Sequence, residues 1–137
     1  MPTLKHIKHY MTATPETIEH DLPLKDALQR MAELRAHHLP VVNAHDLVGI
    51  LSTRDISLAE SLAGKRYANM TVAEAMTPDP FTCGPEAHLD AVAREMYDHR
   101  YGSVVIVDRD HPRDVLGIFT VTDALRVLAT LGDESAD

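Results

Sequence analysis

Two stretches of the chain follow one pattern: Gly49-Ile50-Leu51-Ser52-Thr53-Arg54-Asp55 and Gly117-Ile118-Phe119-Thr120-Val121-Thr122-Asp123. Each reads glycine, two apolar residues, a hydroxyl residue, two variable residues and aspartate. Apolar residues before a serine or threonine are typical of a buried strand that ends at a helix N-cap. A carboxylate three residues after the N-cap completes a reciprocal cap. Each stretch therefore predicts a strand that leads directly into a helix.

The similarity between the two stretches extends over most of the chain. A shift of 65 residues places Met11 on Met76, and a shift of 68 places Gly49 on Gly117. The shift changes because Asp108 to Pro112 makes a longer polar turn than the first copy has, and insertions are tolerated best in such turns. One register with a single slip indicates an internal duplication, which decides the fold.

Each copy predicts the order β-α-β-β-α. Apolar residues at spacings of three and four predict a first helix, and two short β-rich runs around a polar turn predict a hairpin. The expected first strands are 16–18 and 80–83, the first helices 24–34 and 89–96, the hairpins 39–42 with 47–51 and 104–107 with 115–119, and the second helices 52–62 and 120–131. A short helix is expected to begin near Thr71.

The fold class expected from this order is α+β, with the two copies packed as one pseudo-twofold module. A unit of about 60 residues buries too little surface to be stable alone, so the apolar faces of the copies should pack together. The expected organisation is a first motif at 8–64, a linker at 65–75, a second motif at 76–131 and a disordered acidic tail at 132–137.

Composition excludes several classes of protein. The chain has 137 residues, 13 basic and 21 acidic, and a formal net charge of -8, which argues against coating nucleic acid because that affinity comes from neutralising phosphates. No apolar run approaches the roughly 18 residues of a membrane span. No secretory signal is recognisable, and a single cysteine, Cys83, fits a reducing compartment, so a cytoplasmic location is expected.

Metal-dependent and catalytic chemistry are not expected. The chain has nine histidines, but none stands beside a cysteine or glutamate at a spacing typical of zinc ligands. Scattered surface histidines are the simpler interpretation, although His37 or His38 could make a nearby site sensitive to pH. Neither a phosphate-binding loop nor a catalytic triad pattern is present, so the sequence predicts no enzyme.

The strand-to-helix corners have two interpretations. Caps alone explain both the hydroxyl residue and the aspartate. Alternatively, backbone N–H groups at the helix start attract phosphate, while the aspartate accepts hydrogen bonds from ribose hydroxyls. Arg54 adds a charge-assisted contact that Thr122 cannot make, so the two corners should differ in phosphate preference.

The ordered set of motifs resembles the CBS motif, first named from cystathionine β-synthase. The resemblance covers about residues 8 to 130 and includes each Gly-Ile-x-Ser/Thr-x-x-Asp ending. It also rests on His38-Leu39-Pro40-Val41-Val42-Asn43 and Ser103-Val104-Val105-Ile106-Val107-Asp108, with Tyr10-Met11-Thr12 and Ala75-Met76-Thr77 before the motifs. The chain is therefore identified as a stand-alone tandem pair, often called a Bateman module.

The resemblance implies a regulatory module with two related clefts. Proteins of this family commonly bind AMP, ADP, ATP or S-adenosylmethionine, form homodimers and signal occupancy to another protein. The implied ligand contacts are Thr17, Ile18, Pro40, Ser52, Arg54 and Asp55 in the first copy, and Thr82, Cys83, Val105, Thr120, Thr122 and Asp123 in the second. No catalytic cofactor is implied. Two alternatives stay open: a ligand-free dimeric scaffold subunit, and an enzyme acting on nucleotides.

Overall fold

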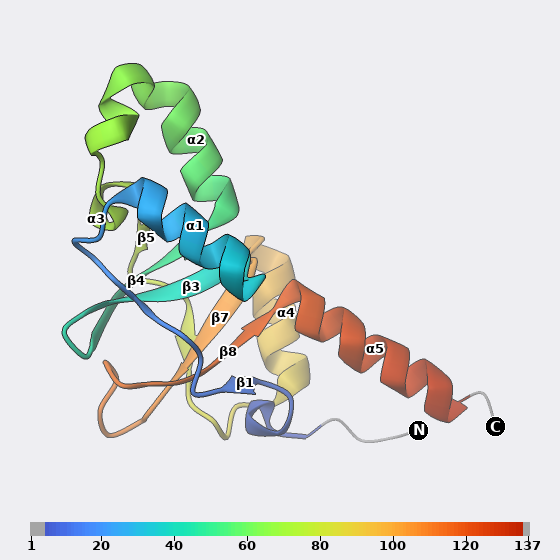
Figure 1. Ribbon diagram of the computed structural model, residues 1–137. Helices are drawn as coiled ribbons and strands as arrows, with labels where there is room; N and C mark the ends of the chain where they lie inside the picture. Colours follow the sequence, from blue (N-terminus) through green and yellow to red (C-terminus); the bar gives the residue numbers. More distant parts are fainter. Residues whose placement is uncertain (1–4, 136–137) are drawn as a thin grey trace. The chain divides into compact units, whose positions relative to one another are not determined.

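The computed structural model describes residues 5–135, which form two compact units (Figure 1). We call Pro15–Pro80 the first-copy unit, and the described residues up to Thr14 together with those from Phe81 onward the second-copy unit. Each unit carries one four-stranded sheet with helices, so the α+β class is confirmed. No helix in the described part of the chain is both long and apolar enough to cross a bilayer.

The first-copy unit has the sheet order β2-β3-β4-β5. Strand β2 is parallel to β3, whereas β4 is antiparallel to both of its neighbours. The elements are β2 (Ile18–Glu19), α1 (Leu24–Leu34), β3 (His38–Asn43), β4 (Asp46–Ser52), α2 (Thr53–Ala63), η2 (Gly64–Asn69), α3 (Val72–Ala75) and β5 (Thr77–Pro78).

The second-copy unit repeats this plan with the sheet order β1-β8-β7-β6. Strand β6 is parallel to β7, and β8 is antiparallel to both β7 and β1. Its elements are η1 (Ile7–His9), β1 (Thr12–Ala13), β6 (Thr82–Cys83), α4 (Leu89–His99), β7 (Ser103–Val107), β8 (Val115–Thr120) and α5 (Val121–Ser135).

The predicted order β-α-β-β-α is confirmed in both units, and α3 begins after its N-cap Thr71 as expected. Helix α5 differs from the expectation because it continues past 131 to Ser135. Gly132 does not adopt the left-handed conformation that commonly ends a helix, so nothing stops the helix there. Residues 132–135 are thus helical rather than a disordered tail, and 136–137 lie outside the described residues.

A short lead-in segment precedes each sequence copy, and its strand, β1 or β5, belongs to the sheet of the other copy. Strand β1 precedes the first copy but pairs with β8 of the second, and β5 precedes the second copy but pairs with β4 of the first. The divisions expected at 8 and 76 follow the sequence repeat, whereas the contacts divide the chain after Thr14 and Pro80. Each lead-in segment therefore supplies an edge strand to the sheet of the other copy.

Each unit has its own apolar core. In the first-copy unit, Leu24, Ala27 and Met31 of α1 pack over the sheet together with Ile56 of α2. Figure 1 shows α1 and α2 on the same side of the β3–β4 hairpin. The spacing of the α1 residues places them on one face of the helix, which explains why the periodicity predicted this element correctly.

The glycine of each corner lies against the lead-in segment of the other copy. A Cβ atom on Gly49 would lie 2.5 Å from Met76 Sδ and 2.8 Å from the Thr77 carbonyl oxygen. On Gly117 it would collide with Met11 Sδ and approach the Thr12 carbonyl oxygen to 3.0 Å. The repeated Met-Thr motif and the repeated glycine therefore pack against each other, once in each unit.

Replacement of either glycine by alanine should destabilise the protein. We expect Gly49→Ala to lower the free energy of unfolding by about 1–3 kcal/mol, the usual cost of overpacking. Gly132→Ala is the matched control, because nothing lies within 4 Å of the added Cβ and alanine favours a helix. Chemical denaturation measures both, and equal stability of Gly49→Ala and Gly132→Ala would contradict the packing argument.

Candidate functional site

The first strand-to-helix corner is a complete capping box. Ser52 is the N-cap of α2, and its hydroxyl oxygen accepts a hydrogen bond from the Asp55 N–H at 3.0 Å. The Asp55 carboxylate in turn accepts from the Ser52 N–H through Oδ2, also at 3.0 Å. The cap interpretation is thus correct for this corner. It leaves Asp55 Oδ1 and the Ser52 hydroxyl proton without a partner among the described residues.

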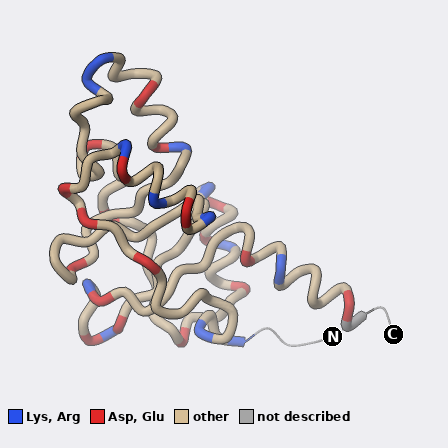
Figure 2. The backbone as a smooth tube through the Cα atoms, viewed as in Figure 1, with Lys and Arg blue, Asp and Glu red and all other residues tan. Residues whose placement is uncertain are grey.

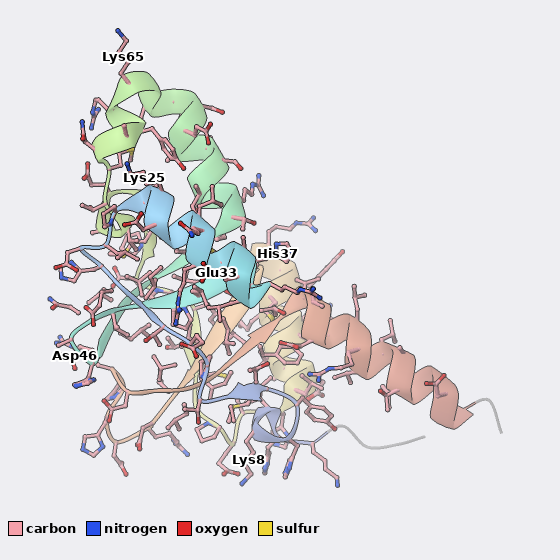
Figure 3. All side chains as sticks on the ribbon, in the orientation of Figure 1. Lys8, Lys25, Glu33, His37, Asp46 and Lys65 are labelled. Carbon is pink, nitrogen blue, oxygen red and sulfur yellow. The ribbon has the colours of Figure 1, made fainter. Side chains whose placement is uncertain are left out.

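The backbone donors at this corner are mostly satisfied. The Thr53 N–H donates to the His37 carbonyl oxygen at 3.0 Å, and the Asp55 N–H is held by Ser52. His37, labelled in Figure 3, lies between α1 and β3. The Arg54 N–H makes no hydrogen bond within the described part of the chain. One amide, rather than a whole helix turn, is therefore available to an anion.

The second corner repeats the cap with additional bonds. The Thr120 N–H and the Thr120 hydroxyl both donate to Asp123 Oδ2, at 2.9 Å and 3.2 Å. The Asp123 N–H donates to the Thr120 hydroxyl at 3.4 Å. Arg126 Nη2 then donates to the other carboxylate oxygen, Oδ1, at 3.2 Å. Both carboxylate oxygens of Asp123 thus accept hydrogen bonds, whereas only Oδ2 of Asp55 does.

Sequence reasoning missed Arg126. Its guanidinium also donates to the Tyr10 carbonyl oxygen at 3.1 Å, so it ties α5 to the segment after η1. The detectable signal was its position three residues after Asp123, since side chains three apart are neighbours on a helix. The repeat places Leu58 at the equivalent position, so only one copy has this contact.

The sheet places the other expected first-copy residues in neighbouring strands. Pro40 of β3 lies opposite Ile50, one strand from Ile18, which pairs with Val41. Pro40 and Ile18 are buried, and the Ile18 side chain belongs to the core, so only the backbone of Ile18 remains for a ligand. Thr17 and Arg54 are exposed.

In the second-copy unit the register aligns three strands. Thr82 pairs with Val105, which pairs with Ile118. Val105 is fully buried, whereas Thr82 and Thr122 are exposed. Cys83 is half-buried and pairs with Ile106. Each expected set of contacts therefore lies within a single unit.

His38 adds a titratable group to the first corner. It pairs with Ser52 across the β3–β4 ladder, and the second copy has Ser103 at the corresponding place opposite Thr120. Burial lowers the pKa of His38 from its ordinary value of 6.5. The nearby Asp55 carboxylate opposes this shift, and His37 adds to it. The folded protein therefore favours neutral His38.

Charge and metal-ligand side chains form no other site in the described residues. Figure 2 shows lysine and arginine scattered along the chain among the acidic residues. No group of three or more His, Cys, Asp or Glu side chains in residues 5–133 is placed to hold a metal ion. Burial raises the pKa of the Cys83 thiol to about 11, so it is protonated at neutral pH.

Comparison with known proteins identifies the family. A family model described as the CBS domain matches residues 7–61 and 72–130, so the chain belongs to the CBS domain family and carries a tandem pair. Its structure superposes with a TM-score of 0.83 on a Vibrio cholerae protein named for acetoin utilization (AcuB), at 27% identity over 97% of this chain and 96% of the other. The CBS domain pair of protein MJ0100, solved with 5′-methylthioadenosine and S-adenosyl-L-methionine, gives 0.81 at 27% identity over 93% and 98%.

Curated relatives include enzymes of which this chain matches only a part. It is 33% identical over 126 residues to an L-aspartate semialdehyde sulfurtransferase from Methanosarcina acetivorans, covering 90% of this chain. The chain spans about a quarter of the length of that relative, 24%. The CBS domain-containing protein YhcV of Bacillus subtilis is 26% identical and is covered to 83% of its length.

The half-buried histidine should make stability depend on pH. Below about pH 6.5 the unfolded chain binds a proton at residue 38 that the folded chain resists, so stability falls as the pH falls. We expect the Tm of the wild-type protein to fall more between pH 7 and pH 5 than that of His38→Gln, which retains a polar side chain. Parallel pH profiles of the two proteins would contradict this assignment.

The Cys83 thiol should react slowly. Because the thiolate is the reactive form, alkylation by iodoacetamide at pH 8 should be on the order of a hundredfold slower than for an exposed cysteine. The same chain in denaturant is the control, and it should react at the ordinary rate. Equal rates in the folded and denatured chain would show that burial does not raise the pKa of Cys83.

Proposed function

We propose that this protein is a regulatory module that binds an adenosine-containing ligand at its strand-to-helix corners and signals occupancy to a partner protein. The observation that supports it best is the first corner, where the Ser52 hydroxyl proton and Asp55 Oδ1 make no hydrogen bond in the described residues, although the Asp55 carboxylate acts electrostatically on the nearby His38. A carboxylate oxygen accepts from ribose hydroxyls, and the Arg54 N–H is a backbone donor for an anionic group.

The remaining contacts follow from the family resemblance. We assign the base to the neighbourhood of Thr17, Ile18 and Pro40, where β2 and β3 run side by side. The corresponding set in the second-copy unit is Thr82, Cys83, Val105, Thr120, Thr122 and Asp123. A related CBS pair at 27% identity was solved with 5′-methylthioadenosine and S-adenosyl-L-methionine, and this supports the adenosine class of ligand.

Signalling would follow from differential affinity. A ligand shifts an equilibrium between two arrangements only by the difference in its affinity for them. The proposed partners are a second copy of the chain and an effector protein. Exposed leucines on α2 and α5, among them Leu62 and Leu125, support a contact between copies.

A ligand-free scaffold is the second candidate, because the caps alone explain Ser52 and Asp55. An enzyme is the third, and several relatives are enzymes, but the chain spans about a quarter of their length. Prolonged incubation with ATP followed by chromatography tests it, since a binding module leaves the nucleotide intact.

Binding should raise thermal stability. A ligand at a hundred times its Kd adds about 2.7 kcal/mol, because it binds only the folded chain. We expect at least one of AMP, ATP, S-adenosylmethionine and 5′-methylthioadenosine to raise the Tm by several degrees. Ribose 5-phosphate, which lacks the base, is the control and should give no rise at the same concentration. No shift with any adenosine ligand would favour the scaffold.

A further inference from the structure

Both carboxylate oxygens of the second corner already accept hydrogen bonds, which leaves one acceptor position, on Oδ1. Asp123 Oδ2 accepts from Thr120, and Oδ1 accepts from Arg126 Nη2 at 3.2 Å. The Asp123 side chain is only 16% exposed, whereas Arg126 is 62% exposed and reaches over it from the solvent side. A ribose at this corner would have to share Oδ1 with the guanidinium or displace it.

The first corner is open where the second is covered. The repeat places Leu58 at the position of Arg126, and leucine cannot donate to Asp55 Oδ1. Leu58 is 57% exposed, so it is not held there by the core of its unit. At this helical position the corners differ by one side chain, in addition to the differences between Arg54 and Thr122 and between His38 and Ser103.

A pocket lies beside Asp55. It has a volume of about 300 Å³, at the lower end of the usual range for small-molecule sites, and lies between α2, η2 and α3. Asp55, Leu58 and Ala75 are among its lining residues. The repeat places Arg126 and Tyr10 at the positions of Leu58 and Ala75, and in the second-copy unit Arg126 bridges to the Tyr10 carbonyl oxygen. The bridge spans the place that corresponds to the pocket.

We infer that the wild-type chain binds its adenosine ligand preferentially at the first corner, and that Arg126 weakens binding at the second by competing for Asp123 Oδ1. This inference rests on the proposed function and names a residue that sets this preference. Because Arg126 is mostly exposed, its ion pair with Asp123 is screened by solvent, so occupation of Oδ1 should weaken binding by up to about fivefold. Arg126 acts on ligand preference by competition and is not itself required for binding.

The first experiment compares the two aspartates by titration calorimetry. Adenosine is the probe, because it carries the ribose hydroxyls without a charged phosphate that would respond to any arginine. We expect a clearly larger loss of adenosine affinity in Asp55→Asn than in Asp123→Asn. Asparagine still accepts the hydrogen bond from the N-cap N–H, so both variants keep the cap.

The second experiment exchanges the residues that differ. Arg126→Leu should remove the competition for Asp123 Oδ1 and strengthen binding at the second corner by up to about fivefold. Leu58→Arg should place a guanidinium three residues after Asp55 and weaken binding at the first corner by up to about fivefold. Both positions are mostly exposed, and thermal unfolding without ligand checks that each variant is folded.

The outcomes separate the inference from the function on which it rests. Two equal sites in the wild-type chain, or equal losses in Asp55→Asn and Asp123→Asn, overturn the inference and leave adenosine binding intact. An unchanged affinity in a folded Leu58→Arg also overturns it. If adenosine, AMP, ATP and S-adenosylmethionine all fail to bind any variant, the proposed function is wrong and the inference falls with it.

Discussion

The reciprocal cap between a hydroxyl N-cap and an aspartate three residues later is the interaction on which both units depend. It lets a buried strand continue into a helix without a connecting loop, because the cap satisfies N–H groups that would otherwise be unpaired. The same geometry brings a carboxylate, a hydroxyl and one unused amide to the end of the strand. The cap that stabilises each corner thus uses the same atoms that we propose for binding, and the corners differ in what else contacts the carboxylate.

Local sequence signals predicted most of the fold. The apolar spacing of Leu24, Ala27 and Met31 predicted α1, and the glycine-to-aspartate pattern predicted both corners. These signals work because the residues that form the core or the cap lie within a few positions of one another. The strand order was harder to derive, since the pairing of β1 with β8 joins residues about a hundred positions apart and carries no local pattern.

The exchange of lead-in segments explains a repeat that sequence reasoning described but did not interpret. Met11 lies against Gly117 and Met76 against Gly49. Each sequence copy therefore supplies the methionine of one contact and the glycine of the other. A copy cut out at the sequence repeat would lose its own edge strand and keep the one that belongs to its neighbour. The duplicated chain is therefore interdependent at the level of the sheets, beyond any burial of apolar faces.

The candidate site was predictable in its residue types but not in its availability. The pattern located Asp55 and Asp123 and gave them equal roles, because a linear motif shows which groups are present and not which are already bonded. Arg126 lies outside the motif and acts through a contact at helical spacing together with a bond to Tyr10 on a distant segment. Duplication supplied two corners with the same cap, and we propose that the exchange of leucine for arginine at one exposed position makes their ligand preference differ.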